Sequence, residues 1–155
     1  MSEMWTRELV WSRYLEAFDT LRRLPGEGRS TTSWPAIIRD FADAIAAEET
    51  RAAEAYPFPP GWGKPAPPSH RAIDRMHALF AWHSKYLSAQ EDAARLVLGM
   101  AWCKTIGFPL TRFFRGRRIR RRDGYRKRDA ALTLVRQGLE RDRVPVDAFE
   151  HVVAA

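Results

Sequence analysis

Positive charge is concentrated in one short segment of this chain. The stretch RFFRGRRIRRRDGYRKRD spans residues 112–129, and ten of its first seventeen residues are Arg or Lys, opposed only by Asp123. Each Arg side chain carries a planar fork of donors that matches phosphate oxygens and base edges. Because like charges at helical spacing repel one another, so dense a cluster is typical of a surface that binds a polyanion. The segment therefore predicts contact with nucleic acid.

Two kinds of contact are expected from this segment. A helix that begins near residue 120 can place its first side chains in the major groove, while flanking arginines lie at phosphates. The residues expected on or beside the groove-facing side are Arg120, Arg121, Arg122, Tyr125, Arg126 and Lys127. The residues expected at phosphates are Arg115, Arg117, Arg118 and Arg128.

The charge cluster is also compatible with roles that do not involve nucleic acid. Arg outnumbers Lys 22 to 4 in the whole chain, so the cluster could equally form a solvated face of an Arg-rich protein. An acidic protein partner would suit the same charges. An anionic membrane is disfavoured, because the basic face lacks a long adjoining stripe of Trp and Leu.

Residue patterns typical of catalysis or metal binding are weak. Asp74 and His77 are spaced i,i+3 and His83 lies six residues further on, whereas two histidines that share a metal on a helix are spaced i,i+4. We expect these histidines to lie on the surface or to be satisfied by Asp74. A single cysteine, Cys103, excludes an internal disulfide and a Cys-based zinc cluster. We therefore expect no enzymatic activity, no metal and no cofactor.

The two halves of the chain differ in charge. Residues 1–70 carry 8 basic and 10 acidic side chains, whereas residues 71–155 carry 18 basic and 9 acidic ones. This asymmetry predicts a polyanion-binding half and a half that contacts a partner. No segment reaches the length of a membrane span, and Glu3 and Glu8 stand where a signal peptide would be basic. We expect a cytoplasmic protein with no membrane contact.

Apolar spacing and turn residues predict the elements that hold the basic segment. A first helix over 5–24 ends at Pro25, and a second begins near Pro35. Six prolines in thirteen residues make 57–69 a stiff, extended joint. The expected organisation is an N-terminal helical region for dimerisation or partner contact at 1–56, a Pro-rich joint at 57–69, and a basic, helix-turn-helix-like domain at 70–155.

Within the basic domain, local signals predict four helices and a short terminal one. Ser69 caps the first, and Ser88 to Glu91 form a capping box for the second, which Gly107 ends. The elements expected after it are a short bracing helix at 109–115 with Leu110, Phe113 and Phe114 buried, a turn from Gly116 to Ile119, a long helix to about Arg141, and a last small helix around Phe149. No strand signal is present, so the expected fold is all-α.

The stretches WTRELVWSRYLEAFDTLRRLP, SWPAIIRDF and AIDRM resemble an uncharacterised bacterial family associated with phages and prophages. Its members combine an N-terminal helical half, a Pro-rich joint and a C-terminal half that resembles the helix-turn-helix of sigma-factor region four. The resemblance implies DNA binding, with Ile119 at the apolar turn position and Arg126 and Lys127 as a basic pair. This chain departs from the family at Gly116, which is displaced, and at Arg120, which replaces a capping hydroxyl. Gly124 weakens the helix start, although Asp123 can cap a helix beginning there.

These patterns together predict a DNA-binding protein of phage or prophage type that acts as a transcriptional regulator. A phage DNA-packaging recognition subunit would use the same residues in a ring. A phage-encoded inhibitor would instead cover a host protein with the Arg-rich surface. Duplex DNA is the expected main partner, and a host or phage protein and further copies of this chain remain open as partners.

Overall fold

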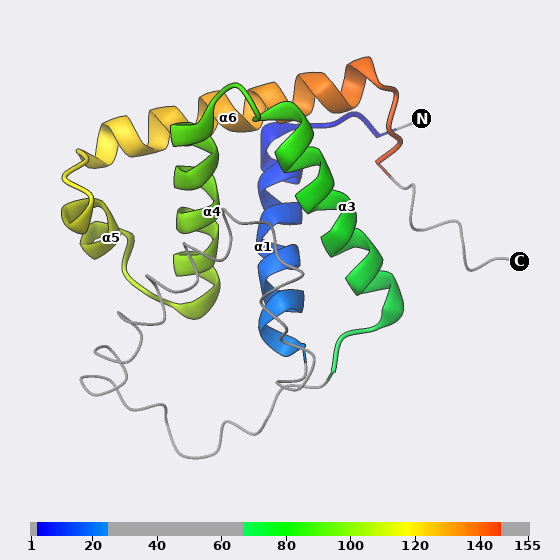
Figure 1. Ribbon diagram of the computed structural model, residues 1–155, viewed down its shortest axis with the longest axis horizontal. Coiled ribbons are helices and arrows are strands. Elements are labelled where there is room, and N and C mark those ends of the chain that lie inside the picture. Colours follow the sequence, from blue (N-terminus) through cyan, green and yellow to red (C-terminus); the bar gives the residue numbers. More distant parts are fainter. Residues whose placement is uncertain (1–2, 25–66, 147–155) are drawn as a thin grey trace, which may run out of the picture. The chain divides into compact units, whose positions relative to one another are not determined.

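The computed structural model describes residues 3–24 and 67–146 (Figure 1). These residues form α-helices and no strand, which confirms the predicted all-α fold. The helices are α1 (Arg7–Arg23), α3 (His70–Tyr86), α4 (Glu91–Ile106), α5 (Leu110–Gly116) and α6 (Arg121–Arg141). The predicted helix near Pro35, most of the joint at 57–69 and the predicted small helix around Phe149 lie outside the described residues.

Helix α4 forms the centre of the core. The residues buried along it are Ala94, Leu96, Val97, Leu98, Gly99, Met100, Ala101 and Cys103. Helix α4 is buried on most sides because both α5 and α6 pack against it and α1 contacts it as well. A helix that is apolar nearly all round is expected in the middle of a core.

Helix α1 belongs to the same compact unit as the basic helices. Of the described residues, 3–22 and 69–146 belong to one compact unit. Phe18 of α1 contacts Phe80 of α3 and Trp102 of α4, with ring centroids 5.7 Å apart in each pair. The first helix of the predicted N-terminal region therefore contributes to the core of the basic domain. The role of 1–56 in dimerisation or partner contact stays a prediction.

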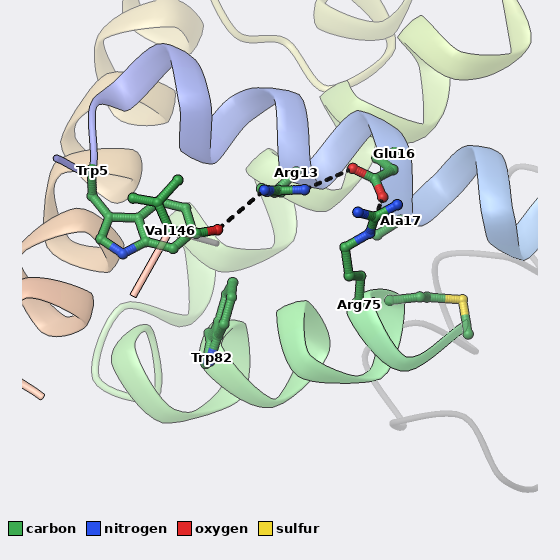
Figure 2. Close-up of a pocket in the computed structure, with 8 residues that line it drawn as sticks. Trp5, Arg13, Glu16, Ala17, Arg75, Trp82 and Val146 are labelled. Atoms are coloured by element: carbon green, nitrogen blue, oxygen red, sulfur yellow. Dashed lines mark hydrogen bonds and ion pairs between the residues drawn. The ribbon is translucent and has the colours of Figure 1, made fainter. Parts of the chain in front are cut away.

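Charged side chains also join α1 to α3 and to the residues after α6 (Figure 2). Glu16 of α1 forms ion pairs with Arg13, at 3.2 Å, and with Arg75 of α3, at 2.6 Å. Arg13 also donates a hydrogen bond of 3.3 Å to the carbonyl of Val146. The space left beside these side chains is about 10 Å³, no more than one water molecule needs. This region is a packed joint and not a ligand pocket.

The turn between α3 and α4 differs from the prediction. The expected capping box at Ser88 is wrong, because α4 begins at Glu91 with Gln90 as its N-cap and without a side-chain capping bond. Leu87 is buried and its carbonyl accepts the N–H of Gln90 at 3.0 Å, which places Ser88 in the turn. Burial of that leucine sets the register of the turn. The predicted cap of α3 is confirmed: Ser69 accepts the Ala72 N–H at 3.2 Å.

Two glycines of α6 allow aromatic rings to lie directly against its backbone. A Cβ atom built at Gly124 would overlap the ring of Phe114, and one at Gly138 would overlap the ring of Tyr86. Gly124 is therefore required for close packing between α5 and α6, and it lies inside the helix instead of disrupting its start. In contrast, a Cβ atom at Gly116 meets nothing within 4 Å.

A buried histidine connects α3 to α1. The Tyr14 hydroxyl lies 2.7 Å from Nδ1 of His83, and their side chains are only 0% and 5% exposed. The sequence predicted that His83 lies on the surface or is satisfied by Asp74. Both alternatives are wrong, because α1 covers that side of α3 and supplies Tyr14 as the partner. Among the described residues, Nε2 of the same ring has no hydrogen-bond partner. Burial lowers the pKa of His83 to about 4 and raises the pKa of Tyr14.

The glycine contacts predict opposite effects of alanine on stability. Gly124→Ala and Gly138→Ala should each lower the free energy of unfolding by about 2 kcal/mol, because the new methyl group overpacks against a ring. The matched control, Gly116→Ala, adds a methyl group to a helix where there is room. It should raise the free energy of unfolding by about 0.5–1 kcal/mol. Urea denaturation of the three variants measures these changes in the free energy of unfolding. Equal effects at all three positions would contradict the close packing of the rings against α6.

The buried histidine predicts loss of stability in acid. Between the ordinary pKa of 6.5 and the folded-state pKa of about 4, the unfolded chain binds a proton that the folded protein excludes. The free energy of unfolding should therefore fall by up to about 3 kcal/mol as pH is lowered through this window. His83→Asn keeps an acceptor for Tyr14 without titrating, so its urea denaturation should lack this part of the pH dependence. The exposed His77→Asn variant should retain it.

Candidate nucleic-acid interface

The basic segment forms a short helix, a turn and the start of a long helix (Figure 1). The short helix α5 runs over Leu110–Gly116 with Pro109 as its N-cap, one residue later than expected. The turn occupies 117–120, and α6 begins at Arg121. The predicted order of elements is confirmed. The assignment of these elements as a helix-turn-helix that docks in the major groove stays a prediction.

Phenylalanine side chains hold the short helix in place. Phe113 and Phe114 are both buried, as expected from the sequence, whereas Leu110 is only half-buried because it lies on the first turn, beside a groove. The ring of Phe114 lies against α6 at Gly124 and contacts the ring of Tyr125 edge-on, with centroids 5.7 Å apart. Burial of two such rings fixes α5 and the first turns of α6 as one local unit.

The turn itself depends on an arginine in the left-handed conformation. Arg118 has φ 55°, a region that favours glycine. Its N–H donates to the Arg115 carbonyl at 3.1 Å, and the N–H of Ile119 donates to the Phe114 carbonyl at 3.0 Å. This pair of bonds is the usual way to end a helix with a left-handed residue. The predicted turn residue Gly116 lies instead in the last turn of α5, and Ile119 is half-buried after it.

The start of α6 lacks a side-chain cap. Arg120 is the N-cap residue and makes no capping hydrogen bond through its side chain. The suggested helix start capped by Asp123 is wrong, because α6 begins at Arg121 and Asp123 lies within its first turn. A carboxylate there interacts favourably with the positive end of the helix dipole, which offsets part of the repulsion among the arginines.

Seven of the predicted contact residues are exposed and have no carboxylate partner. They are Arg115, Arg118, Arg120, Arg121, Arg122, Arg126 and Lys127, and together they are called the cationic surface below. Within residues 3–24 and 67–146, none of the seven forms an ion pair with a carboxylate. Arg122 and Arg126 are four residues apart on α6 and so lie on the same side of the helix. These seven charges are therefore exposed and without an ion pair in the described part of the chain.

The other three predicted residues are engaged in internal contacts. The guanidinium of Arg128 lies 5.0 Å from the Trp11 ring centroid and 4.9 Å from that of Tyr125, and it pairs with Asp129 at 3.0 Å. Tyr125 is half-buried. The guanidinium of Arg117 lies 5.1 Å from the Phe113 ring centroid, and burial lowers its pKa. These residues support the local structure, and the phosphate and groove contacts expected of them stay predictions.

The structure also shows a groove that the sequence analysis missed. Lys104 and Phe108, which flank the end of α4, line it together with Arg121 and Tyr125 of the predicted site. Its volume is about 410 Å³, and we call it the α4–α6 groove. The sequence signal was a cation and an aromatic residue on either side of Gly107, but their convergence with α6 depends on tertiary packing.

The described ranges contain neither a cluster of metal-ligating side chains nor a membrane-spanning helix. No group of three or more His, Cys, Asp or Glu side chains there could hold a metal ion. None of the helices in residues 3–24 and 67–146 is long and apolar enough to cross a membrane.

Comparisons with known proteins were negative: no protein-family model matches the chain, and no curated protein or solved structure is significantly similar to it. The resemblance to a phage-associated family rests on the sequence stretches quoted above.

Proposed function

We propose that this protein binds nucleic acid, with duplex DNA as its main ligand, through the cationic surface. One observation carries the proposal: the exposed arginines of this surface have no carboxylate partner within the described residues. Elsewhere in the same residues, Arg13, Arg95 and Arg136 all form ion pairs at 2.8–3.2 Å. Within the described residues the protein thus pairs many of its cations but leaves those of the cationic surface unpaired, as expected when the balancing charges come from phosphates.

The local geometry suits a phosphate backbone. Arg115 lies in the last turn of α5, Arg118 and Arg120 lie in the turn that follows, and Arg122 and Arg126 belong to α6. The first backbone N–H groups of α6 lack intrahelical acceptors, so the positive end of the helix adds to the attraction. An α-helix fits the width of the major groove, where arginine can read guanine through two donors. Arg118, in the turn, would meet a phosphate beside the groove.

The biological role that we propose is that of a transcriptional regulator of phage or prophage type. The sequence resemblance and the order of short helix, turn and long basic helix support it. A packaging subunit would bind through the same residues in a ring, so the oligomeric state distinguishes the two roles. If this protein instead inhibits a host protein, excess duplex DNA would not displace that host protein from it.

Salt dependence tests the electrostatic part of the proposal. If about six phosphates are engaged, the affinity for random duplex DNA should fall with salt with a log–log slope of roughly −5. Fluorescence anisotropy with labelled duplex, single-stranded DNA and RNA over a range of salt concentrations measures this slope for each ligand. A salt-independent affinity, or no binding at low salt, would remove the support for a phosphate-binding surface.

Charge reversal tests the location of the interface. The triple variant Arg120→Glu, Arg121→Glu and Arg126→Glu should abolish duplex binding and remain folded, because all three side chains are exposed. A triple reversal at exposed Arg7, Arg23 and Arg143 changes the net charge equally and should retain most of the binding. Circular dichroism checks the fold of both proteins. Retained binding by the first variant would show that the interface lies elsewhere.

Two arginines in the same backbone conformation provide a finer comparison. Arg118 and Arg143 both have φ 55°, so replacing either with glycine relieves strain and should raise the free energy of unfolding by about 1 kcal/mol. Only Arg118 belongs to the cationic surface. Arg118→Gly should therefore weaken duplex binding and reduce the steepness of the salt slope by about 1, whereas Arg143→Gly should leave both unchanged. Equal effects of the two variants on binding would argue against a localised surface.

A further inference from the structure

We propose that the α4–α6 groove binds one unpaired base of the nucleic acid that the cationic surface holds. This inference rests on the proposed function and adds to it a second, chemically distinct subsite. The expected ligand of the groove is a nucleobase that is already unstacked, because the protein then spends no energy on flipping the base out of a duplex.

The groove has the size and lining that a base requires. The lining residues that can contact a nucleic acid are Lys104, Phe108, Arg121 and Tyr125. Its volume of about 410 Å³ lies within the range of small-molecule sites. The half-buried ring of Phe108 offers an aromatic surface on which any base can stack. The Tyr125 hydroxyl makes no hydrogen bond within the described residues, so it can contact a base edge.

The charges around the groove match the phosphates on either side of such a base. Lys104 and Arg121 line it, and no carboxylate does. The guanidinium of Arg112 lies 5.9 Å from the Phe108 ring centroid, which adds a third cation close to the aromatic surface. Charge complementarity therefore favours a nucleic-acid strand over an apolar peptide side chain, which would gain nothing from these cations.

Continuity with the cationic surface connects the two sites. Arg121 belongs to both, because its side chain is exposed on the first turn of α6 and also lines the groove. A strand held by that surface would pass the opening of the groove. In a fully paired duplex all bases are stacked and the groove would stay empty. The protein should therefore prefer a ligand with an unpaired base next to a duplex.

Three labelled DNA hairpins of equal length and charge distinguish a base from a backbone contact. One is fully paired, one contains a single bulged 2-aminopurine, and one has the same bulge without its base. The protein should bind the 2-aminopurine bulge about tenfold more tightly than the abasic bulge, as expected for one base–aromatic stack. The fluorescence of 2-aminopurine should fall on binding, because stacking quenches it.

Variants assign this preference to the groove. Phe108→Leu keeps an apolar side chain but removes the ring, so it should lose both the tenfold preference and the quenching while it retains affinity for the paired hairpin. Lys104→Gln should weaken binding of the two bulged hairpins more than binding of the paired one. Its matched control, Lys127→Gln, removes the same charge from the cationic surface and should weaken all three equally.

The outcomes separate this inference from the proposed function. Equal affinity for the 2-aminopurine and abasic bulges overturns the base subsite but leaves duplex binding intact. Failure to bind any hairpin overturns the proposed function as well. If Phe108→Leu weakens binding to all three hairpins equally and keeps its helical circular dichroism spectrum, the groove is only part of the duplex-binding surface and the inference is wrong. If that variant unfolds, the Lys104→Gln variant, at an exposed position, is used instead. Equal weakening of binding to all three hairpins would again show that the inference is wrong.

Discussion

The contact between the Phe114 ring and the backbone of α6 at Gly124 is the constraint on which the basic region depends. Neighbouring cations on a helix repel one another by a few tenths of a kcal/mol per pair, which taken alone would loosen the first turns of α6. Burial of one phenylalanine side chain contributes about 1.5–3 kcal/mol, enough to offset several such pairs. The ring can lie close enough to α6 only because residue 124 lacks a Cβ atom. Apolar packing beneath the surface thus allows a dense positive charge above it.

Helix α1 supplies a second support, at a greater distance along the chain. Its Trp11 ring lies 5.0 Å from the guanidinium of Arg128, which also contacts Tyr125. A cation–π contact of this kind contributes about 0.5–1 kcal/mol at an exposed site and more when water is excluded. A buried hydrogen bond between Tyr14 and His83 also connects α1 to α3. The first helix therefore positions the basic helix, and does not only belong to a separate partner-binding half.

The distribution of charge explains why the proposed interface has two parts. Salt bridges lie mainly around α1, α3 and the later turns of α6, whereas the start of α6 has exposed cations and a groove with an aromatic lining. Phosphates suit the exposed cations because their attraction needs no close fit. A base suits the groove because its aromatic lining offers a ring on which a base can stack. A surface built in this way would recognise both the charge of a nucleic acid and a local irregularity in it.

Local patterns in the sequence were enough for the order of the elements and for much of the candidate site. Ser69 begins α3, Gly107 ends α4 in a left-handed conformation, and the long helix ends at Arg141, because caps and apolar spacing act over a few residues. Exposure of the arginines at the start of α6 follows from the same short-range reasoning. Tertiary structure decided what depends on residues far apart in the chain: the burial of His83 under α1, the engagement of Arg128 by Trp11, and the convergence of Lys104 and Phe108 with α6. No local pattern predicts these contacts, since each arises only when separate helices pack together.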